Sequence, residues 1–225
     1  MKTWGALKAE IFDETNTEGE DFVSAGELLV WANDAKDAAE AEIVSIYDKY
    51  METEDFLPLV AGVALVDPPT GIYANKVTGF FFNDGNEKYE IKKLKRKSDI
   101  LLINDNDRYR YDFINDATNG IQIKIYPTPR ETAAEIATMH FIRESNAIED
   151  DDSLMDIPIA DAFIKQYIID KIKEVEFGPA VASGPSQALV IQKNLFIEAL
   201  NEMTPDESSG EIEMDLGFYE DVELL

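Results

Sequence analysis

The 225-residue chain contains no cysteine, and this absence excludes several kinds of chemistry at once. Disulfide bonds, thiolate zinc sites and cysteine nucleophiles all need that residue. The single histidine, His140, leaves no HExxH zinc motif and gives a Ser-His-Asp triad only one candidate base, without a GxSxG elbow. We therefore interpret His140 as an ordinary strand residue, and we expect no catalytic residue, no metal site and no cofactor.

Phosphate-binding glycine loops and long apolar runs are also missing. Neither GxGxxG nor GxxxxGK[ST] occurs, so nucleotide chemistry has no support. The longest apolar stretch, residues 59–66, is far shorter than the ~18 residues that a membrane span needs. The start of the chain leads into no apolar signal-like segment. We predict a soluble protein that is not exported and has no membrane partner.

Basic residues are scarce, because 20 Lys and Arg stand against 46 Asp and Glu, a net charge of −26. Such a surface repels phosphate backbones and anionic lipids, which argues against a general nucleic-acid-binding protein. The exception is a basic cluster of five residues within six positions: Lys92, Lys93, Lys95, Arg96 and Lys97. Two interpretations stay open for it: a hairpin tip kept soluble by lysines, and an electrostatic contact with an acidic partner or a DNA backbone.

Apolar residues that recur every three or four positions predict a long helix near the N-terminus, from Ser24 to Tyr50. Ser24 and Glu27 have the spacing of a capping box at its start. Lys36 and Glu40 lie one turn apart, and we expect both on the solvent-exposed face.

Apolar residues again recur every three or four positions towards the C-terminus. One helix is predicted from Ile157-Pro158 to Gly178-Pro179, and a second from Ser186 to Met203. Because the connection between them is short, we expect an antiparallel helical hairpin.

Between these helical regions the pattern is typical of short β-strands separated by turns. Strands are predicted at residues 59–66, 77–82, 108–114, 121–125 and 136–142. Asn83-Asp84-Gly85-Asn86 has the composition of a hairpin turn. Pro68-Pro69 and Pro127-Thr128-Pro129 end the strands that precede them, because proline cannot donate to a ladder.

The predicted fold class is therefore α+β, with an antiparallel β-rich domain inserted into a helical bundle. Residues 1–52 and 150–203 form the bundle, and residues 53–149 form the insert. Residues 204–225 form an extended acidic C-terminal arm with eight acids and no Lys or Arg. The arm also carries apolar residues, so we expect it to become ordered by docking on another surface. Its expected contact residues are Met214, Leu216, Phe218, Tyr219, Val222, Leu224 and Leu225.

The many carboxylates leave two other functions open. A pair of them could hydrolyse glycans, although nothing in the sequence singles out a pair. Asp150, Asp151 and Asp152 could bind calcium in a calcium-dependent binding module, although this run does not complete the spacing of an EF-hand loop. Solvated loop acids are the simpler interpretation.

Three segments resemble the head-to-tail adaptor proteins of tailed bacteriophages, the head-completion or connector ring proteins. Residues 3–7 and the phrase Trp31-Ala32-Asn33-Asp34-Ala35 are similar to the family's Trp-Gly-x-Leu start and Trp-x-Asn-x-Ala helix. The strand that ends in Pro127-Thr128-Pro129 resembles its pre-loop P-x-P. The helices from Ile157-Pro158 through Phe196 resemble its closing helical hairpin.

The resemblance implies a structural virion protein rather than an enzyme. Such adaptors form a closed ring, commonly a dodecamer, that docks on the portal protein and extends the DNA channel at the head-tail junction. The implied partners are further copies of the chain, the portal, the next tail or ring protein, and genomic DNA that passes without specific binding. The protein would be made in the host cytoplasm and end at the portal vertex. We expect the basic cluster and the arm to provide the partner contacts.

Overall fold

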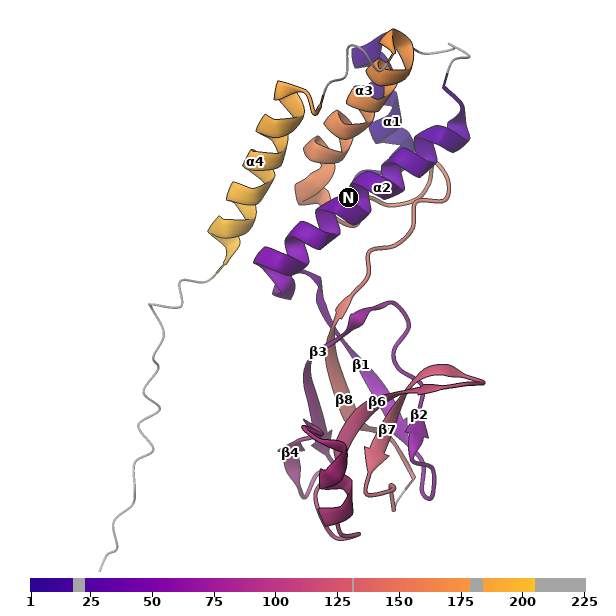
Figure 1. Cartoon of the computed structure of the whole chain (residues 1–225), viewed down its shortest axis with the longest axis vertical. Helices are drawn as coiled ribbons and strands as arrows, with labels where there is room; N and C mark the ends of the chain where they lie inside the picture. The colour runs from indigo at the N-terminus through magenta and orange to yellow at the C-terminus, as the bar shows by residue number, and fades with distance from the viewer. Residues whose placement is uncertain (18–22, 131, 179–183, 205–225) are drawn as a thin grey trace, which may run out of the picture.

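The helices and the strands of the chain lie at opposite ends of an elongated molecule (Figure 1). A computed structural model describes residues 1–17, 23–130, 132–178 and 184–204, with the backbone alone for residues 133–136. Helices from both ends of this part of the sequence come together, while its strands all derive from the middle. The molecule is therefore α+β, as predicted. The predicted arm lies outside the described residues, apart from Thr204.

The helical end contains four α-helices in the described ranges. They are α1 (Trp4–Thr15), α2 (Ala25–Ile46), α3 (Asp161–Phe177) and α4 (Gln187–Met203). Phe163 in the first turn of α3 stacks on Phe196 of α4, and the Asp170 carboxylate accepts hydrogen bonds from the main chain and hydroxyl of Ser186 at the start of α4. The two helices therefore run antiparallel, which confirms the predicted hairpin.

Helix α2 begins where the sequence predicts and ends earlier. The Ser24 hydroxyl accepts from the Glu27 amide, and the Glu27 carboxylate accepts from the Ser24 amide, so the capping box is present. Tyr50 lies beyond the helix, in the 3₁₀ turn η1 (Asp48–Met51), which leads directly into the first strand. A second 3₁₀ turn, η3 (Pro158–Ala160), precedes α3.

Helix α1 is an element that the sequence pattern did not predict. Its buried residues Trp4, Leu7 and Ile11 have helical spacing, and the Thr3 hydroxyl caps its first turn. A helix of 12 residues depends on tertiary packing for its stability. Only these three apolar residues indicate the helix in the sequence, which is too short a pattern to predict it.

The strands form two four-stranded sheets. The first has the order β1 (Glu52–Leu59), β8 (Ala133–Arg143), β3 (Ile72–Asn83) and β4 (Lys88–Glu90), all antiparallel. The second has the order β2 (Leu65–Val66), β7 (Gly120–Tyr126), β6 (Arg110–Asp116) and β5 (Lys92–Lys93). Only the pair β5–β6 is parallel among the described strands. The hairpin between β3 and β4 contains the predicted turn, with Gly85 at a positive φ.

The single buried strand predicted for residues 59–66 is wrong. Strand β1 ends at Leu59, and the chain turns before the two-residue strand β2 begins at Leu65. Gly62, at φ 78°, allows this turn, and its amide donates to the Pro129 carbonyl at 2.9 Å. The turn carries the chain from the first sheet to the second, which leaves Val63 exposed.

Buried apolar residues form two clusters. One lies between the helices, and the other lies between the two sheets, where Phe80, Ile123 and Ile125 are fully buried. Ile142, near the end of β8, belongs to the helical cluster, so the two cores meet where β8 leaves the sheet. The division at residues 53–149 stays a prediction. Below, the helical end is called the helical unit and the two sheets are called the β unit.

Candidate interaction surfaces

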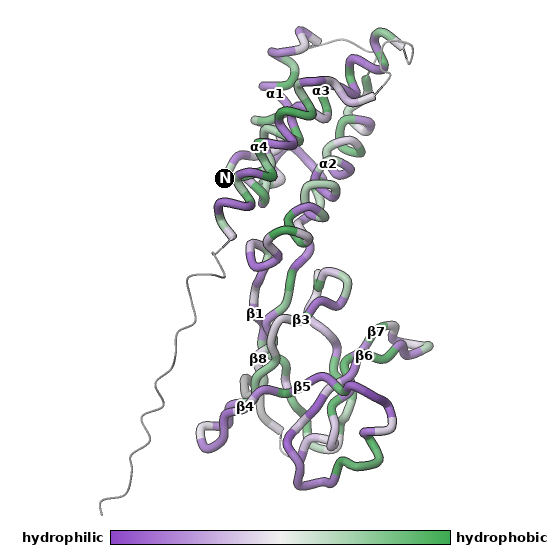
Figure 2. The backbone as a smooth tube through the Cα atoms, turned by 60° about the vertical axis from the view of Figure 1, so that its left-hand side comes forward, coloured by the Kyte–Doolittle hydropathy of each residue, from purple (hydrophilic) through white to green (hydrophobic). Residues whose placement is uncertain are grey.

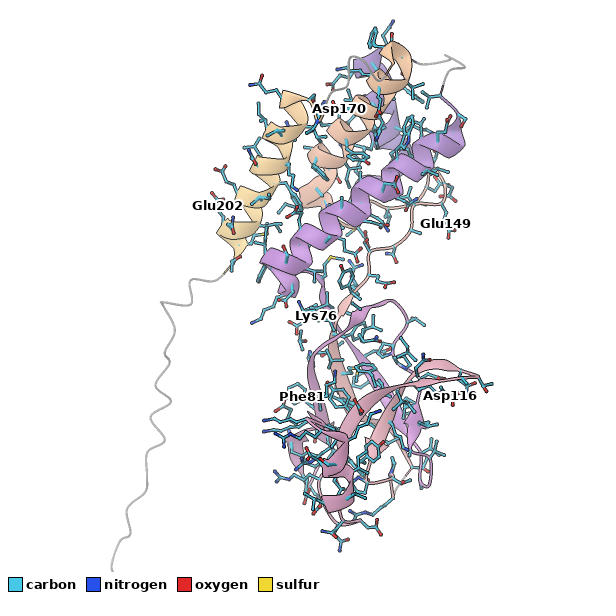
Figure 3. All side chains as sticks on the ribbon, viewed as in Figure 1. Lys76, Phe81, Asp116, Glu149, Asp170 and Glu202 are labelled. Atoms are coloured by element: carbon cyan, nitrogen blue, oxygen red, sulfur yellow. The ribbon has the colours of Figure 1, made fainter. Side chains whose placement is uncertain are left out.

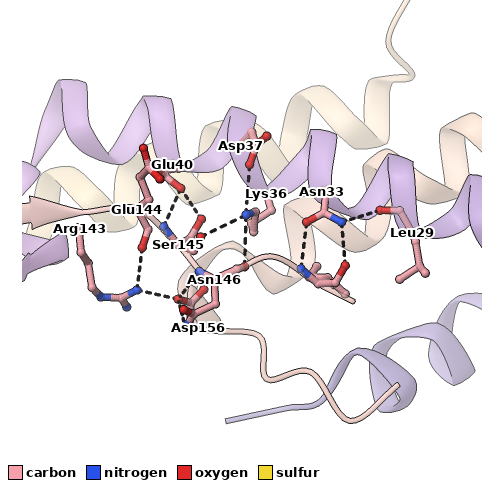
Figure 4. A network of polar contacts seen from close by, with 11 residues as sticks. Leu29, Asn33, Lys36, Asp37, Glu40, Arg143, Glu144, Ser145, Asn146 and Asp156 are labelled. Carbon is pink, nitrogen blue, oxygen red and sulfur yellow. Dashed lines mark hydrogen bonds and ion pairs between the residues drawn. The ribbon is translucent and has the colours of Figure 1, made fainter. Parts of the chain in front are cut away.

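The segment that follows β8 is held along helix α2 by polar side chains (Figure 4). Asn33 binds the main chain of Ile148 on both sides: its Oδ1 accepts from the Ile148 amide at 3.0 Å, and its Nδ2 donates to the Ile148 carbonyl at 2.9 Å. Nδ2 also donates to the Leu29 carbonyl one turn back in α2. The asparagine of the Trp-x-Asn-x-Ala phrase therefore replaces a strand partner for this extended segment.

Lys36 and Glu40 continue this row and are buried, with exposed fractions of 7% and 4%. The prediction that they face solvent is wrong, because the segment after β8 covers them. Glu40 accepts hydrogen bonds from both the amide and the hydroxyl of Ser145, and Lys36 donates to the carbonyls of Ser145 and Asn146 at 3.4 and 3.2 Å. Buried charges are tolerated when they are hydrogen-bonded in this way.

Asp156 closes the network on the other side of the same segment. Its carboxylate accepts from the Arg143 guanidinium at 2.7 Å and from the main-chain and side-chain nitrogens of Asn146 at 3.0 and 3.1 Å. Arg143 is the last residue of β8, so this network ties the end of the β unit to α2. It is a structural junction between the two units.

The acidic run at 149–152 has a structural role at the start of α1. The amides of Trp4 and Gly5 donate to the carbonyls of Ser153 and Asp151 at 2.8 and 2.9 Å, and a Cβ on Gly5 would lie 2.9 Å from that Asp151 oxygen. Asp150 accepts from the Asp152 amide and the Ser153 hydroxyl, while Asp151 pairs with Lys8. Across the described residues no three acids or histidines are grouped as metal ligands. The calcium-binding alternative is therefore not supported.

His140 lies in β8, as predicted, and its surroundings are those of a strand residue. Its ring packs edge-on against Phe81 of β3, with ring centroids 5.4 Å apart. Its Nε2 lies 3.6 Å from the Glu54 carboxylate across the β1–β8 pair. Nothing in this arrangement singles out a carboxylate pair for glycan hydrolysis, and that alternative is not supported either.

The basic cluster follows β4, in the part of the β unit that is farther from the helices (Figure 1). Two buried residues, Ile91 and Leu94, anchor it: the Ile91 amide donates to the Phe80 carbonyl of the first sheet, and the Leu94 amide donates to the Tyr111 carbonyl of the second. The five basic side chains around these anchors are exposed. None of them pairs with a carboxylate in the part of the chain that the structure describes.

The cluster is not the hairpin tip of the first interpretation, because Lys92 and Lys93 pair in parallel with β6, and the partner contact stays a prediction. Lys92 and Lys93 form β5, the edge strand of the second sheet, where lysine discourages further strand pairing. Lys92 lies in register beside Arg110 of β6, and Lys93 lies 5.4 Å above the ring of Phe113. From residue 88 to residue 110 the chain holds eight bases against four acids, so this end is positive in a strongly negative protein.

An exposed apolar segment that was not predicted as a site directly follows the cluster. The 3₁₀ turn η2 (Lys97–Leu102) buries no residue, and Leu101 and Leu102 are 90% and 76% exposed. In Figure 2 the hydrophilic stretch after β5 passes into a hydrophobic one at this end. The signal in the sequence was four apolar residues, 100–103, between polar ones. We call residues 92–102 the basic tip.

The loop after η2 lines a cavity of about 400 Å³ together with the β3–β4 hairpin and Arg130. The Arg108 guanidinium lies 5.0 Å above the ring of Tyr89, and Arg130 donates to the Asn106 side chain at 3.2 Å. Asp84 also lines the cavity, and hydrogen bonds from the amides of Glu87 and Asn86 lower the pKa of its carboxyl. The cavity therefore holds two arginines and three acids, Asp84, Glu87 and Asp107, and does not add to the net positive charge of the basic cluster.

A second apolar surface lies on α4. Only Phe196 and Leu200 of this helix are buried. Val190, Ile191 and Leu195 are about half exposed on its outer side. No element of the described chain covers them.

These surfaces define a class of protein. The described residues form exposed charged and apolar surfaces on the two sides of a polar structural junction. Such surfaces are typical of a protein that acts by binding other subunits. The expected arm contacts, Met214 to Leu225, lie outside the described residues. In the part of the chain that the structure describes, no helix is both long and apolar enough to cross a membrane.

A comparison with protein families identifies the particular kind of assembly protein. The model of the SU10 adaptor protein family matches residues 2–213, nearly the whole chain, and the chain belongs to that family. It is a phage structural adaptor, a component of the virion that interacts with other virion components. No curated protein matches the chain.

Proposed function

We propose that the chain forms a closed ring at the head-tail junction, docks on the portal and extends the DNA channel. The ring also provides the platform for the next tail component. The single observation that carries this proposal is the family match over residues 2–213, which makes the chain a phage adaptor. The unpartnered surfaces described above supply the contacts that such a ring needs.

The helical unit is the part that we assign to contacts between subunits. Val190, Ile191 and Leu195 leave a half-exposed apolar side on α4, and burial of apolar area contributes ~25 cal/mol per Å². A head-to-tail contact uses two different surfaces of each subunit and closes into a ring when the rotation per subunit divides a full turn. We expect the outer side of α4 to be one of those two surfaces. We also expect the ring to be a dodecamer, the common copy number of such adaptors.

The β unit and the arm are the parts that we assign to neighbouring components. The basic tip carries charge opposite to the rest of the protein, which favours an oriented electrostatic contact. The arm adds apolar side chains that can bind the portal or a neighbouring subunit. Together they would join the ring to what lies above and below it.

The net charge of −26 suits a channel wall. Lysine and arginine on a wall would bind phosphates by releasing counterions, and the DNA would then adhere to it. A predominantly acidic wall repels the phosphates, so the genome can slide past it.

Native mass spectrometry of the protein, alone and mixed with the portal, tests the proposal. We expect a closed oligomer of one copy number, formed alone or on the portal. Monomers only, in both samples, would contradict it.

A further inference from the structure

We propose that in the free subunit the acidic arm lies on the basic tip of its own chain and covers Leu101 and Leu102. The occupant is the segment 211–225. This inference goes beyond the proposed function, because it concerns the subunit before it assembles. On assembly the arm would leave the tip and make its contacts with the portal or a neighbour.

The tip has the exposure of a surface that binds something. Leu101 and Leu102 are 90% and 76% exposed, and they lie side by side in η2. Single exposed apolar residues are common on proteins, but adjacent ones next to a charged rim are typical of an interaction site. Ile100 and Ile103 flank them and are half-buried, so they extend the apolar area at its base.

Charge identifies the arm as the occupant. The five basic residues of the tip have no carboxylate partner among the described residues, and the arm has eight acids and no base. Acidic and apolar residues alternate strictly along Glu211-Ile212-Glu213-Met214-Asp215-Leu216. In an extended segment, alternate side chains point to opposite faces, so acids would lie on one face and apolar residues on the other. Such a segment matches a surface on which lysines border leucines.

The arm is also long enough to reach the tip of its own chain. Glu202 lies at the end of α4 that is nearer to the β unit, so the chain leaves the helical unit on that side (Figure 3). Residues 205–225 span at most about 70 Å when extended. The longest strand of the β unit, β3, has 12 residues and is therefore about 40 Å long. Because the arm is tethered, its effective concentration at the tip is in the millimolar range, which favours its own tip over another subunit's.

The absence of cysteine makes a direct test possible, since any introduced pair is unique. The test variant carries Leu102→Cys and Phe218→Cys. Its matched control carries Val63→Cys and Phe218→Cys, because Val63 is exposed in the β1–β2 turn, outside the basic tip. A short bis-maleimide is added to the dilute free subunit without portal. We expect the intrachain cross-link to form about tenfold more at position 102, the ratio given by a contact of ~1.4 kcal/mol.

Charge reversal on the test variant examines the electrostatic part. Lys95→Glu with Lys97→Glu is expected to reduce the cross-link to the control yield. Lys49→Glu with Lys173→Glu changes the net charge equally at the helical unit and is expected to leave the yield unchanged. Equal yields at positions 102 and 63, cross-links only between chains, or no effect of the reversal at the tip would overturn the proposal. Because no ring or portal is present, failure here is independent of the proposed function.

Discussion

At the scale of single residues, Asn33 shows how one side chain can replace a strand partner. Its amide group matches both hydrogen-bonding groups of Ile148 and reaches back to Leu29 as well. Three main-chain polar groups are satisfied by one residue, whereas Asp, of the same size, lacks the donor and Leu lacks both donor and acceptor.

Replacing Asn33 is therefore expected to destabilise the protein. Asn33→Ala leaves the amide and carbonyl of Ile148 without this partner, and a loss of about 2 kcal/mol in the free energy of unfolding is expected. Asn33→Asp keeps the acceptor and removes the donor, so it should also destabilise. Urea denaturation measures both. Asn194→Ala, on the exposed side of α4, is the control and should have little effect; an equal loss in the control would contradict this role.

Asp84 predicts a pH dependence in the β3–β4 hairpin. Amides of Glu87 and Asn86 donate to its carboxylate, which lowers its pKa in the folded state. A lowered pKa means that the stabilisation is present above the unfolded-state value, about 3.9, and is lost as the pH falls through the folded-state value. The difference in melting temperature between wild type and Asp84→Ala should therefore be larger at pH 7 than at pH 3. A difference that grows towards acid pH would contradict this assignment.

At the scale of elements, the sequence predicts correctly those features that depend on contacts between residues close together in the chain. The capping box of α2, the Gly85 turn and the Ser186 cap of α4 rely on neighbours within four residues, and all were predictable. The burial of Lys36 and Glu40 depends on a segment more than a hundred residues away. The helical spacing of the sequence alone therefore placed both residues on the solvent-exposed face. Ile121 alternates with Ile123 and Ile125 but is half exposed, because it lies beside Asn115 near the hairpin end.

Some features of the candidate sites are also visible in the sequence alone, whereas others depend on the fold. Charge is visible in a sequence, and the basic cluster was predicted as exposed contact residues. The exposure of Leu101 and Leu102 was not, because four apolar residues in a row are usually buried and only the fold places them at the far end of the β unit. The role of Asn33 needed its partner at position 148, which no local pattern supplies.

Helix α4 gives a prediction about assembly. Ile191→Asp with Leu195→Asp places two charges on its exposed apolar side, so subunit association should weaken at least tenfold, a change of ~1.4 kcal/mol. The melting temperature of the monomer should change little, because neither side chain is buried. Sedimentation velocity measures the association. Ala117→Asp with Thr118→Asp adds the same charge to the β6–β7 turn and is the control; equal weakening would show a general effect of charge.

At the scale of the whole molecule, the charge is divided unevenly along the chain. The described β unit carries the positive tip, and the last 21 residues carry eight of the 46 acids. Such polarity within one chain favours specific contacts over uniform repulsion, which agrees with a protein whose family is defined by assembly.

Truncation of the arm should separate assembly from folding. Deleting residues 215–225 removes Leu216, Phe218 and Tyr219, which we expect to bury apolar area on other surfaces rather than in the two cores. By calorimetry the melting temperature of the monomer should fall by no more than about 5 °C, the effect of losing a contact of ~1.4 kcal/mol with the basic tip, while binding to the portal weakens. A monomer that unfolds on truncation would show that the arm packs on its own core instead.

The most direct measurement of the central claim is an electron cryo-microscopy reconstruction of the protein bound to the portal. The account predicts a closed ring below the portal, with its channel continuous with the portal channel. Within the ring, α4 should contact the adjacent subunit. Isolated subunits scattered on the portal, or a protein that does not bind the portal at all, would contradict it.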